Sequence, residues 1–177
     1  MADRLTGRWG YRLTFVIFAI ILIFLQLLPL HPGPGRLPGA DVLLLIALSW
    51  TVFNPAIVPV WLVAGVFLMS DLLLMRPPGL WAALAVLACE FARNRRMPLR
   101  TAPFFVEWLL VAGIVAGMTV ANTLILSIFA VPQPTFGLTV IRLIFTILAY
   151  PLVVLFLGRA LGLSKTGEDR DILGARG

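Results

Sequence analysis

Long apolar runs, separated by short segments rich in proline, glycine or arginine, dominate this sequence. A helix that crosses the hydrocarbon layer of a bilayer, about 30 Å thick, needs about 20 mainly apolar residues, and somewhat fewer where the bilayer thins. By this criterion the pattern predicts six membrane-spanning helices. They are expected at residues 13–30, 41–53, 56–75, 80–91, 104–130 and 138–163.

The division of the second apolar run into two spans depends on its prolines. As one helix, residues 41–75 would be roughly 50 Å long at 1.5 Å per residue, which exceeds the bilayer thickness. Asn54-Pro55, followed by Pro59, provides the break, because proline disfavours helix at the residue before it. We therefore expect a short second span and a separate third span.

The distribution of basic residues predicts the orientation. With six spans, eleven of the fourteen Lys and Arg residues fall on one side of the membrane, including the loop that holds Arg93, Arg95, Arg96 and Arg100. Such an excess marks the cytoplasmic side. The sequence thus predicts an all-α integral membrane protein with both termini cytoplasmic, a single membrane domain over 1–163 and a polar cytoplasmic tail over 164–177.

Composition agrees with this class. Hydrophobic residues make up 60% of the chain and charged residues 12%, with a net charge of +6. The mean hydropathy is +1.01. A water-soluble domain carries about 25% charged residues. Because the basic residues flank apolar runs, we expect contact with anionic lipid headgroups and no nucleic-acid partner.

No reaction chemistry is apparent. Cys89 is the single cysteine and His31 the single histidine, which leaves no disulfide and none of the usual zinc or di-iron ligand sets. The chain also lacks a phosphate-binding loop, a His-Glu-x-x-His motif and a Gly-x-Ser-x-Gly turn. We predict a protein that is not an enzyme and has no cofactor.

Four charged residues are expected to meet at the non-cytoplasmic side. Asp71 lies inside the third span, where a charge is costly and needs a partner, and Asp41, Arg76 and Arg142 lie near the ends of other spans. We interpret the four as a polar cluster that holds the helices in register. A ligand or headgroup pocket around Asp71 and Arg142, or a proton or ion relay, stays open as an alternative.

Other polar and small residues are expected to act in helix packing. Glu90 and Glu107 flank the basic loop and are predicted to pair with its arginines. Asn122 lies in a polar stripe with Thr119, Thr123 and Ser127, which we expect to bond a neighbouring helix. The pairs Gly113/Gly117 and Gly158/Gly162 would permit close helix approach, within the chain or with a partner, while Trp50, Trp61, Trp81 and Trp108 are expected at the membrane interfaces.

The central segment has a distinctive pattern. An acid opens a short apolar span that ends at an aromatic residue and a proline, and a glycine-containing span then closes on Asp before a turn with glycine. The residues of this pattern are Ala40-Asp41-Val42-Leu43-Leu44-Leu45, Trp50, Asn54-Pro55, Gly65, Ser70-Asp71-Leu72-Leu73 and Pro78-Gly79-Leu80. In this pattern the segment resembles the MreD family of bacterial rod shape-determining proteins.

Two positions depart from the family pattern. Ala40 stands where members often have proline, and Phe67 where they often have glycine. Asp41, Asp71 and Gly79 match, and the resemblance gives Asp71 the role of a buried polar anchor without a catalytic function.

The resemblance implies a non-catalytic scaffold of the cell-wall elongation complex in the bacterial inner membrane, which maintains rod shape and peptidoglycan synthesis. It implies binding to the single-span protein MreC, and direct or indirect contact with RodA and a class B penicillin-binding transpeptidase. The actin-like MreB filament is a further candidate partner. The family's helix arrangement is thought to resemble the substrate-binding subunits of energy-coupling-factor transporters, so a small-molecule- or lipid-binding transporter subunit is the alternative.

Overall fold

The computed structural model describes residues 2–28, 39–53, 58–95 and 103–161, and within these ranges the chain is helical without strands. The helices are α1 (Ala2–Leu27), α2 (Val42–Phe53), α3 (Val60–Leu73), α4 (Leu80–Asn94), α6 (Phe104–Ile128) and α7 (Phe136–Leu161). The predicted tail over 164–177 lies outside the described residues.

Five of these helices begin and end within four residues of the predicted spans, and α1 differs. Helix α1 starts at Ala2, well before the apolar run at residue 13, because the arginine-containing stretch before it holds no proline and continues the same helix. Among the described residues, three helical segments are long and apolar enough to cross a membrane: Gly10–Leu27 of α1, Phe104–Ile128 of α6 and Phe136–Arg159 of α7. Large apolar side chains are exposed along all three. The described part of the chain therefore has the surface of a membrane protein.

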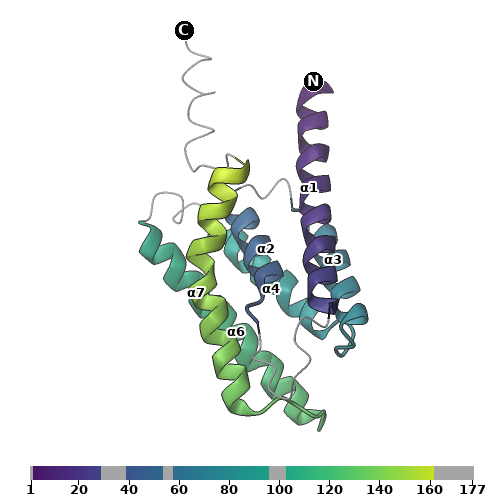
Figure 1. Ribbon diagram of the computed structural model, residues 1–177, viewed down its shortest axis with the longest axis vertical. Coiled ribbons are helices and arrows are strands. Elements are labelled where there is room, and N and C mark those ends of the chain that lie inside the picture. The colour runs from purple at the N-terminus through teal and green to yellow at the C-terminus, as the bar shows by residue number, and fades with distance from the viewer. Residues whose placement is uncertain (1, 29–38, 54–57, 96–102, 162–177) are drawn as a thin grey trace.

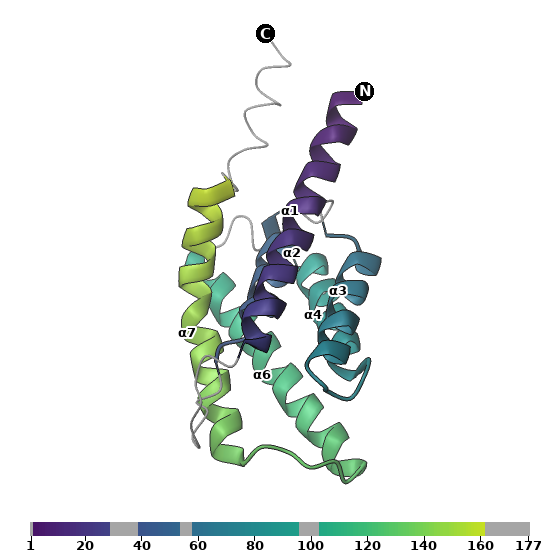
Figure 2. The same ribbon diagram turned by 45° about the vertical axis from the view of Figure 1, so that its right-hand side comes forward.

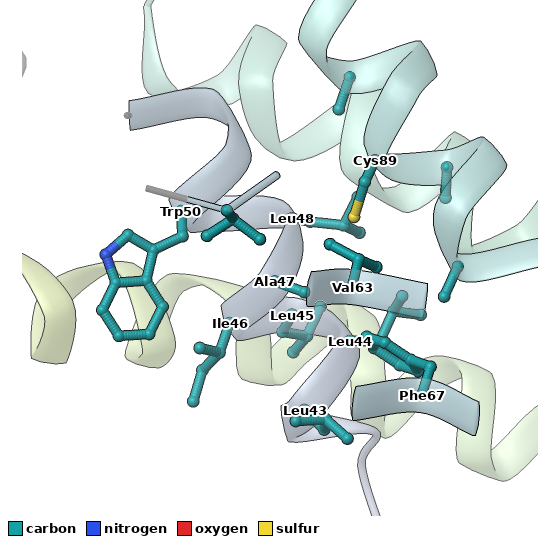
Figure 3. Packing of buried hydrophobic residues seen from close by; sticks show 14 of the residues in the cluster. Leu43, Leu44, Leu45, Ile46, Ala47, Leu48, Trp50, Val63, Phe67 and Cys89 are labelled. Atoms are coloured by element: carbon teal, nitrogen blue, oxygen red, sulfur yellow. The ribbon is translucent and has the colours of Figure 1, made fainter. Parts of the chain in front are cut away.

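Helix α2 is enclosed by the other helices. Ten of its twelve residues are buried, and it packs against α1, α4 and α7. At roughly 18 Å it is shorter than the hydrocarbon layer, as expected for a buried core helix whose ends need not reach both bilayer surfaces. Its leucines meet Val63 and Phe67 of α3 and Cys89 of α4 in the core (Figure 3).

The position of Trp50 differs from the one predicted from the sequence. The position of this residue near the end of a predicted span indicated a membrane-interface aromatic, but its side chain is fully buried. Its ring meets Phe15 of α1 edge-on, with the ring centroids 5.2 Å apart, and Phe18 at 6.4 Å. Because α2 lies inside the bundle, the end of this short helix is still core.

A hydrogen bond joins α6 to α7 at the turn of α7 that precedes Pro151. Pro151 inside α7 has no N–H to donate to the carbonyl of Ile147 four residues earlier. The indole Nε1 of Trp108 on α6 donates to that carbonyl at 3.0 Å. A tryptophan expected to anchor the chain at the interface thus also satisfies a backbone group on the neighbouring helix.

The chain reverses direction from each helix to the next. As a result, the start of α1 and the end of α7 lie at the same end of the bundle (Figures 1 and 2). The opposite end is formed by the start of α2, the α3–α4 turn and the α6–α7 connection. Of the four charged residues singled out in the sequence, Asp41 and Arg76 belong to these segments. Asp71 lies in the last turn of α3, and Arg142 lies about two turns into α7.

Candidate functional site

Asp41 connects the start of α2 to α7. Its Oδ1 accepts a hydrogen bond from the backbone N–H of Leu44 at 3.2 Å, which caps the helix. Its own backbone N–H donates to Oγ1 of Thr146 at 3.0 Å, and the Thr146 hydroxyl in turn donates to the carbonyl of Arg142 at 2.8 Å. Both the side chain and the backbone N–H of Asp41 are therefore held by hydrogen bonds.

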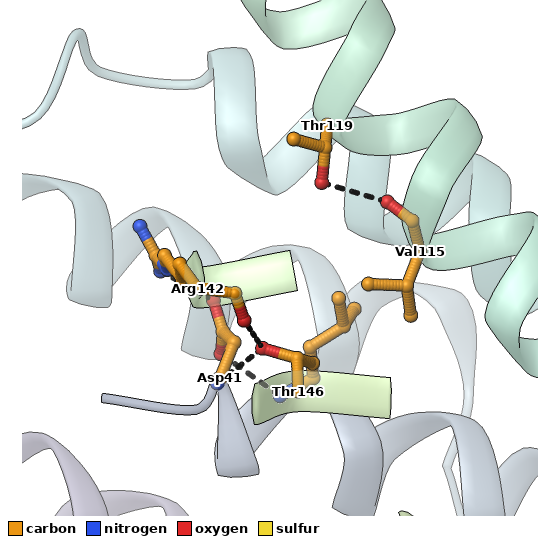
Figure 4. A network of polar contacts seen from close by, with 6 residues as sticks. Asp41, Val115, Thr119, Arg142 and Thr146 are labelled. Carbon is orange, nitrogen blue, oxygen red and sulfur yellow. Dashed lines mark hydrogen bonds and ion pairs between the residues drawn. The ribbon is translucent and has the colours of Figure 1, made fainter. Parts of the chain in front are cut away.

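Arg142 completes this contact. Its Nη2 lies 2.9 Å from Oδ2 of Asp41, an ion pair in which the carboxylate is almost buried and the guanidinium about one-third exposed (Figure 4). The two residues are far apart in sequence but adjacent in the fold. The predicted association of Asp41 with Arg142 is present in the structure.

Asp71 is paired differently from what its sequence context indicated. The side chain is fully buried at the end of α3, and its Oδ2 accepts hydrogen bonds from the backbone N–H groups of Gly79 at 3.2 Å and Ala82 at 3.1 Å. Gly79, the residue before α4, has φ +87° and no side chain with which to cap the helix. Asp71 thus caps α4 from the preceding helix, and no arginine lies within ion-pair distance of it among the described residues.

The ring of Trp81 lies beside both arginines of the predicted polar cluster. The guanidinium carbons of Arg76 and Arg142 lie 5.9 Å and 5.6 Å from its ring centroid, within cation–π distance. Burial and the charge of Arg142 lower the pKa of Arg76, while Asp41 and Asp71 act in the opposite direction. An arginine nevertheless stays protonated at neutral pH, so both guanidinium groups are cations here.

These residues border a cavity of about 460 Å³. Asp41, Arg76, Trp81 and Arg142 line it together with Asn122 of α6, and apolar side chains from α2, α4, α6 and α7 form the rest of the wall. Such a volume falls in the range of small-ligand sites, which combine an apolar wall with few polar groups. The lining of the cavity includes the start of α2, the α3–α4 turn and the α6–α7 connection, and these segments lie at the end of the bundle opposite the start of α1.

The polar stripe on α6 does not bond a neighbouring helix among the described residues. The hydroxyls of Thr119, Thr123 and Ser127 donate to backbone carbonyls one turn earlier on α6 itself. Gln133 of the α6–α7 connection donates to the Thr123 carbonyl and to the Ser127 hydroxyl. Asn122 forms no side-chain hydrogen bond with the described residues, so its amide is available in the cavity.

Gly113, Gly117 and Gly158 do not mark close contacts between the described helices. A Cβ placed at Gly113, Gly117 or Gly158 would meet no heavy atom within 4 Å. Gly113 and Gly117 instead line an apolar groove of about 800 Å³ between α4 and α6, called here the α4–α6 groove. Its other lining residues are Leu84, Leu87, Ala88, Phe91, Val106, Leu109, Leu110, Ile114, Met118 and Ala121. Gly162 lies outside the described residues.

The basic loop is described only at its beginning. Arg93 donates to the carbonyl of Val58 at 2.7 Å and lies 3.3 Å from Glu90, so the predicted pairing of that acid is present. Arg95 lies over the ring of Phe91. Arg96 and Arg100 lie outside the described residues.

Two features of the molecule were missed by sequence reasoning. Glu107 is fully buried and accepts a hydrogen bond from the hydroxyl of Tyr150 at 2.7 Å, which links α6 to α7 in the core. The other is the placement of Trp81 beside two arginines. Tyr150 lies on a different helix from Glu107, and Arg142 on a different helix from Trp81, so no spacing in the sequence indicates these contacts.

Comparison with protein-family models, with curated proteins and with solved structures gave no match. The resemblance to the MreD family therefore rests on the sequence motif of the central segment. Among the described residues, no group of three His, Cys, Asp or Glu side chains is placed to hold a metal ion.

The Asp41–Arg142 pair carries the first prediction. We expect Asp41→Asn to lower the free energy of unfolding by about 1 kcal/mol, because the amide oxygen keeps the helix cap but the charge is lost. Asp41→Ala loses both and should cost about 1 kcal/mol more. Unfolding in mild detergent, followed by circular dichroism, measures both changes. Equal losses for the two variants would contradict a separate capping role.

Proposed function

We propose that this chain is a non-catalytic scaffold of the cell-wall elongation machinery that binds the single transmembrane helix of an MreC-type protein. The observation that carries the proposal is the α4–α6 groove. The described helices leave this groove uncovered, and both of its glycines sit in the middle of α6, where each costs about 1 kcal/mol of helix stability relative to alanine.

A transmembrane helix fits the chemistry of the groove. Lipid gives no hydrophobic drive for helix association, so partners in the bilayer meet where small residues allow backbones to approach closely. Gly113, Gly117, Ala88 and Ala121 provide such a surface, and polar area is almost absent from the groove. The family resemblance supplies the identity of the partner, and contact with RodA, a class B penicillin-binding transpeptidase and MreB would follow through it.

The proposal includes the membrane topology. We infer six spans in the bacterial inner membrane with both termini cytoplasmic, from the arginine asymmetry of the sequence. The alternation of helix direction supports it, since α1 begins and α7 ends at one end of the bundle. In this arrangement the short α2 is enclosed by the other helices, while α3 and α4 each present apolar side chains, such as Leu72 and Leu87, to the bilayer.

The test is recovery of partners from native membranes in mild detergent with a tagged chain. Wild type should recover a single-span MreC-type protein together with wall synthases. We expect the double variant Gly113→Leu/Gly117→Leu to reduce that recovery about tenfold or more, because two leucine side chains fill the groove. Gly158→Leu is the matched control, since this glycine of α7 is equally open but lies outside the groove.

Equal recovery with the groove and control variants would refute the groove as the contact surface. Recovery of no wall protein by wild type would refute the scaffold itself.

The polar cavity favours one second candidate, a small-molecule- or lipid-binding subunit of a transporter. A subunit of this kind needs a cavity in which polar groups from several helices converge, and Asp41, Arg76, Asn122 and Arg142 provide one. It also needs a partner that hydrolyses ATP. Recovery of an ATPase pair in place of wall proteins would favour it, and so would a likeness of its helix arrangement to energy-coupling-factor subunits.

A further inference from the structure

The side chains that line the cavity at the start of α2 include two arginines and one carboxylate. Arg76 and Arg142 each carry five N–H donors and no acceptor. Within the described residues the Arg76 side chain forms no hydrogen bond or ion pair, and its contact is with the ring of Trp81. The indole N–H of Trp81 is buried and has no acceptor among the described residues.

Among the described residues, neither acid of the cluster accepts a hydrogen bond from the Arg76 side chain. Asp41 gives one oxygen to Arg142 and the other to the N–H of Leu44. Asp71 uses Oδ2 for the N–H groups of Gly79 and Ala82 and does not line the cavity. The lining residues therefore carry two positive charges and one negative charge, and the second cation has no anionic partner among the described residues.

We propose that this cavity binds the phosphate group of an anionic amphiphile, held by the guanidinium groups of Arg76 and Arg142 beside Trp81. A phosphate offers acceptor oxygens in several directions, so it can receive both arginine forks and offset the repulsion between them. Arginine is suited to this task because its planar donors match phosphate oxygens in pairs.

The apolar part of the wall indicates an amphiphile rather than a fully polar anion. Leu44, Val115, Leu126 and Leu143 line the cavity, and apolar area exceeds polar area there. The site also lies at one end of a bundle with three helices long and apolar enough to span a membrane, and helix ends are where headgroups are expected. At about 460 Å³ the cavity has room for a headgroup and the beginning of an acyl chain.

This inference goes beyond the scaffold and does not depend on it, because the phosphate site and the α4–α6 groove share no residue. Failure of one leaves the other intact.

The test uses the purified full chain in nanodiscs of phosphatidylcholine, into which phosphatidylglycerol is titrated. We expect a saturable rise in the thermal unfolding midpoint and a retained phosphatidylglycerol in native mass spectrometry. Arg76→Gln should weaken the apparent affinity about tenfold or more, because it removes charge-assisted bonds. Arg159→Gln, which removes an exposed charge at the other end of α7, should leave the affinity unchanged.

A second variant, Arg76→Lys, distinguishes weaker phosphate binding from a folding defect. It keeps the positive charge, so it should fold as wild type, but it loses the planar fork and should still bind several-fold more weakly. An equal response of wild type, Arg76→Gln and Arg76→Lys to phosphatidylglycerol would overturn the proposal. The absence of any saturable response in wild type would overturn it as well.

A separate titration distinguishes a lipid phosphate from the phosphate of a water-soluble ester. Glycerol phosphate, added to the chain in a neutral detergent, tests a water-soluble ligand with the same anionic group. No effect of glycerol phosphate beside a clear effect of phosphatidylglycerol assigns the site to a lipid. Stabilisation by glycerol phosphate that Arg76→Gln abolishes assigns it to a soluble phosphate ester.

Discussion

Replacing Asp71 by alanine is expected to lower the free energy of unfolding by about 1–3 kcal/mol. The carboxylate is fully buried and accepts the N–H groups of Gly79 and Ala82, so its removal leaves both donors of α4 without a partner. Gly79 cannot replace the cap because it has no side chain. Equilibrium unfolding in mixed micelles gives the free energy directly.

Asp71→Asn is the matched control for this effect. Both hydrogen bonds reach the same oxygen, Oδ2, while Oδ1 has no partner among the described residues. An asparagine amide oxygen in the Oδ2 position can accept both bonds, and the change removes a charge whose burial is costly. We expect stability close to wild type. If asparagine destabilises as much as alanine, the negative charge of Asp71 matters more than its capping role.

Trp50→Ala is expected to have the largest effect of any single substitution in the core, a loss of about 3–5 kcal/mol. The indole is fully buried in α2 and packs against Phe15 and Phe18 of α1, so truncation leaves a cavity at the point where α1 joins the bundle. The thermal unfolding midpoint in mild detergent should fall accordingly.

Trp50→Phe separates packing from hydrogen bonding. The indole N–H finds no acceptor among the described residues, so phenylalanine sacrifices volume but no bond. We expect it to retain most of the stability that alanine loses. Trp61→Ala serves as the control, because Trp61 is 60% exposed on α3 and should cost far less. A loss at Trp61 equal to that at Trp50 would mean that the exposed face is as tightly packed as the core.

The α4–α6 groove and the cavity differ in chemistry. The α4–α6 groove is apolar and open, which suits a protein helix in the bilayer. The cavity is lined by two arginines and lies between helices, which suits a small anionic group. A scaffold that binds both would hold its protein partner on one side of α6 and a phosphate-bearing amphiphile beside the α6–α7 connection.

The sequence by itself determined the approximate ends of five of the six described helices, while the start of α1 lies well before the predicted span. Apolar runs of helix length, divided by Asn54-Pro55 and by the turn before Gly79, are local signals that need no knowledge of neighbours. The same is true of the need of Asp71 for a partner, because a charge inside an apolar span is unfavourable wherever that span packs.

Tertiary structure alone decided which groups satisfy each other. The partner of Asp71 is the backbone of α4, the partner of Asp41 lies on α7, and Trp108 bonds a carbonyl that Pro151 leaves free. It also decided that Trp50 is core, and that Gly113 and Gly117 face an open groove. Apolar periodicity shows that a helix has neighbours but not which ones, since every helix in this chain is apolar enough to pack against any other.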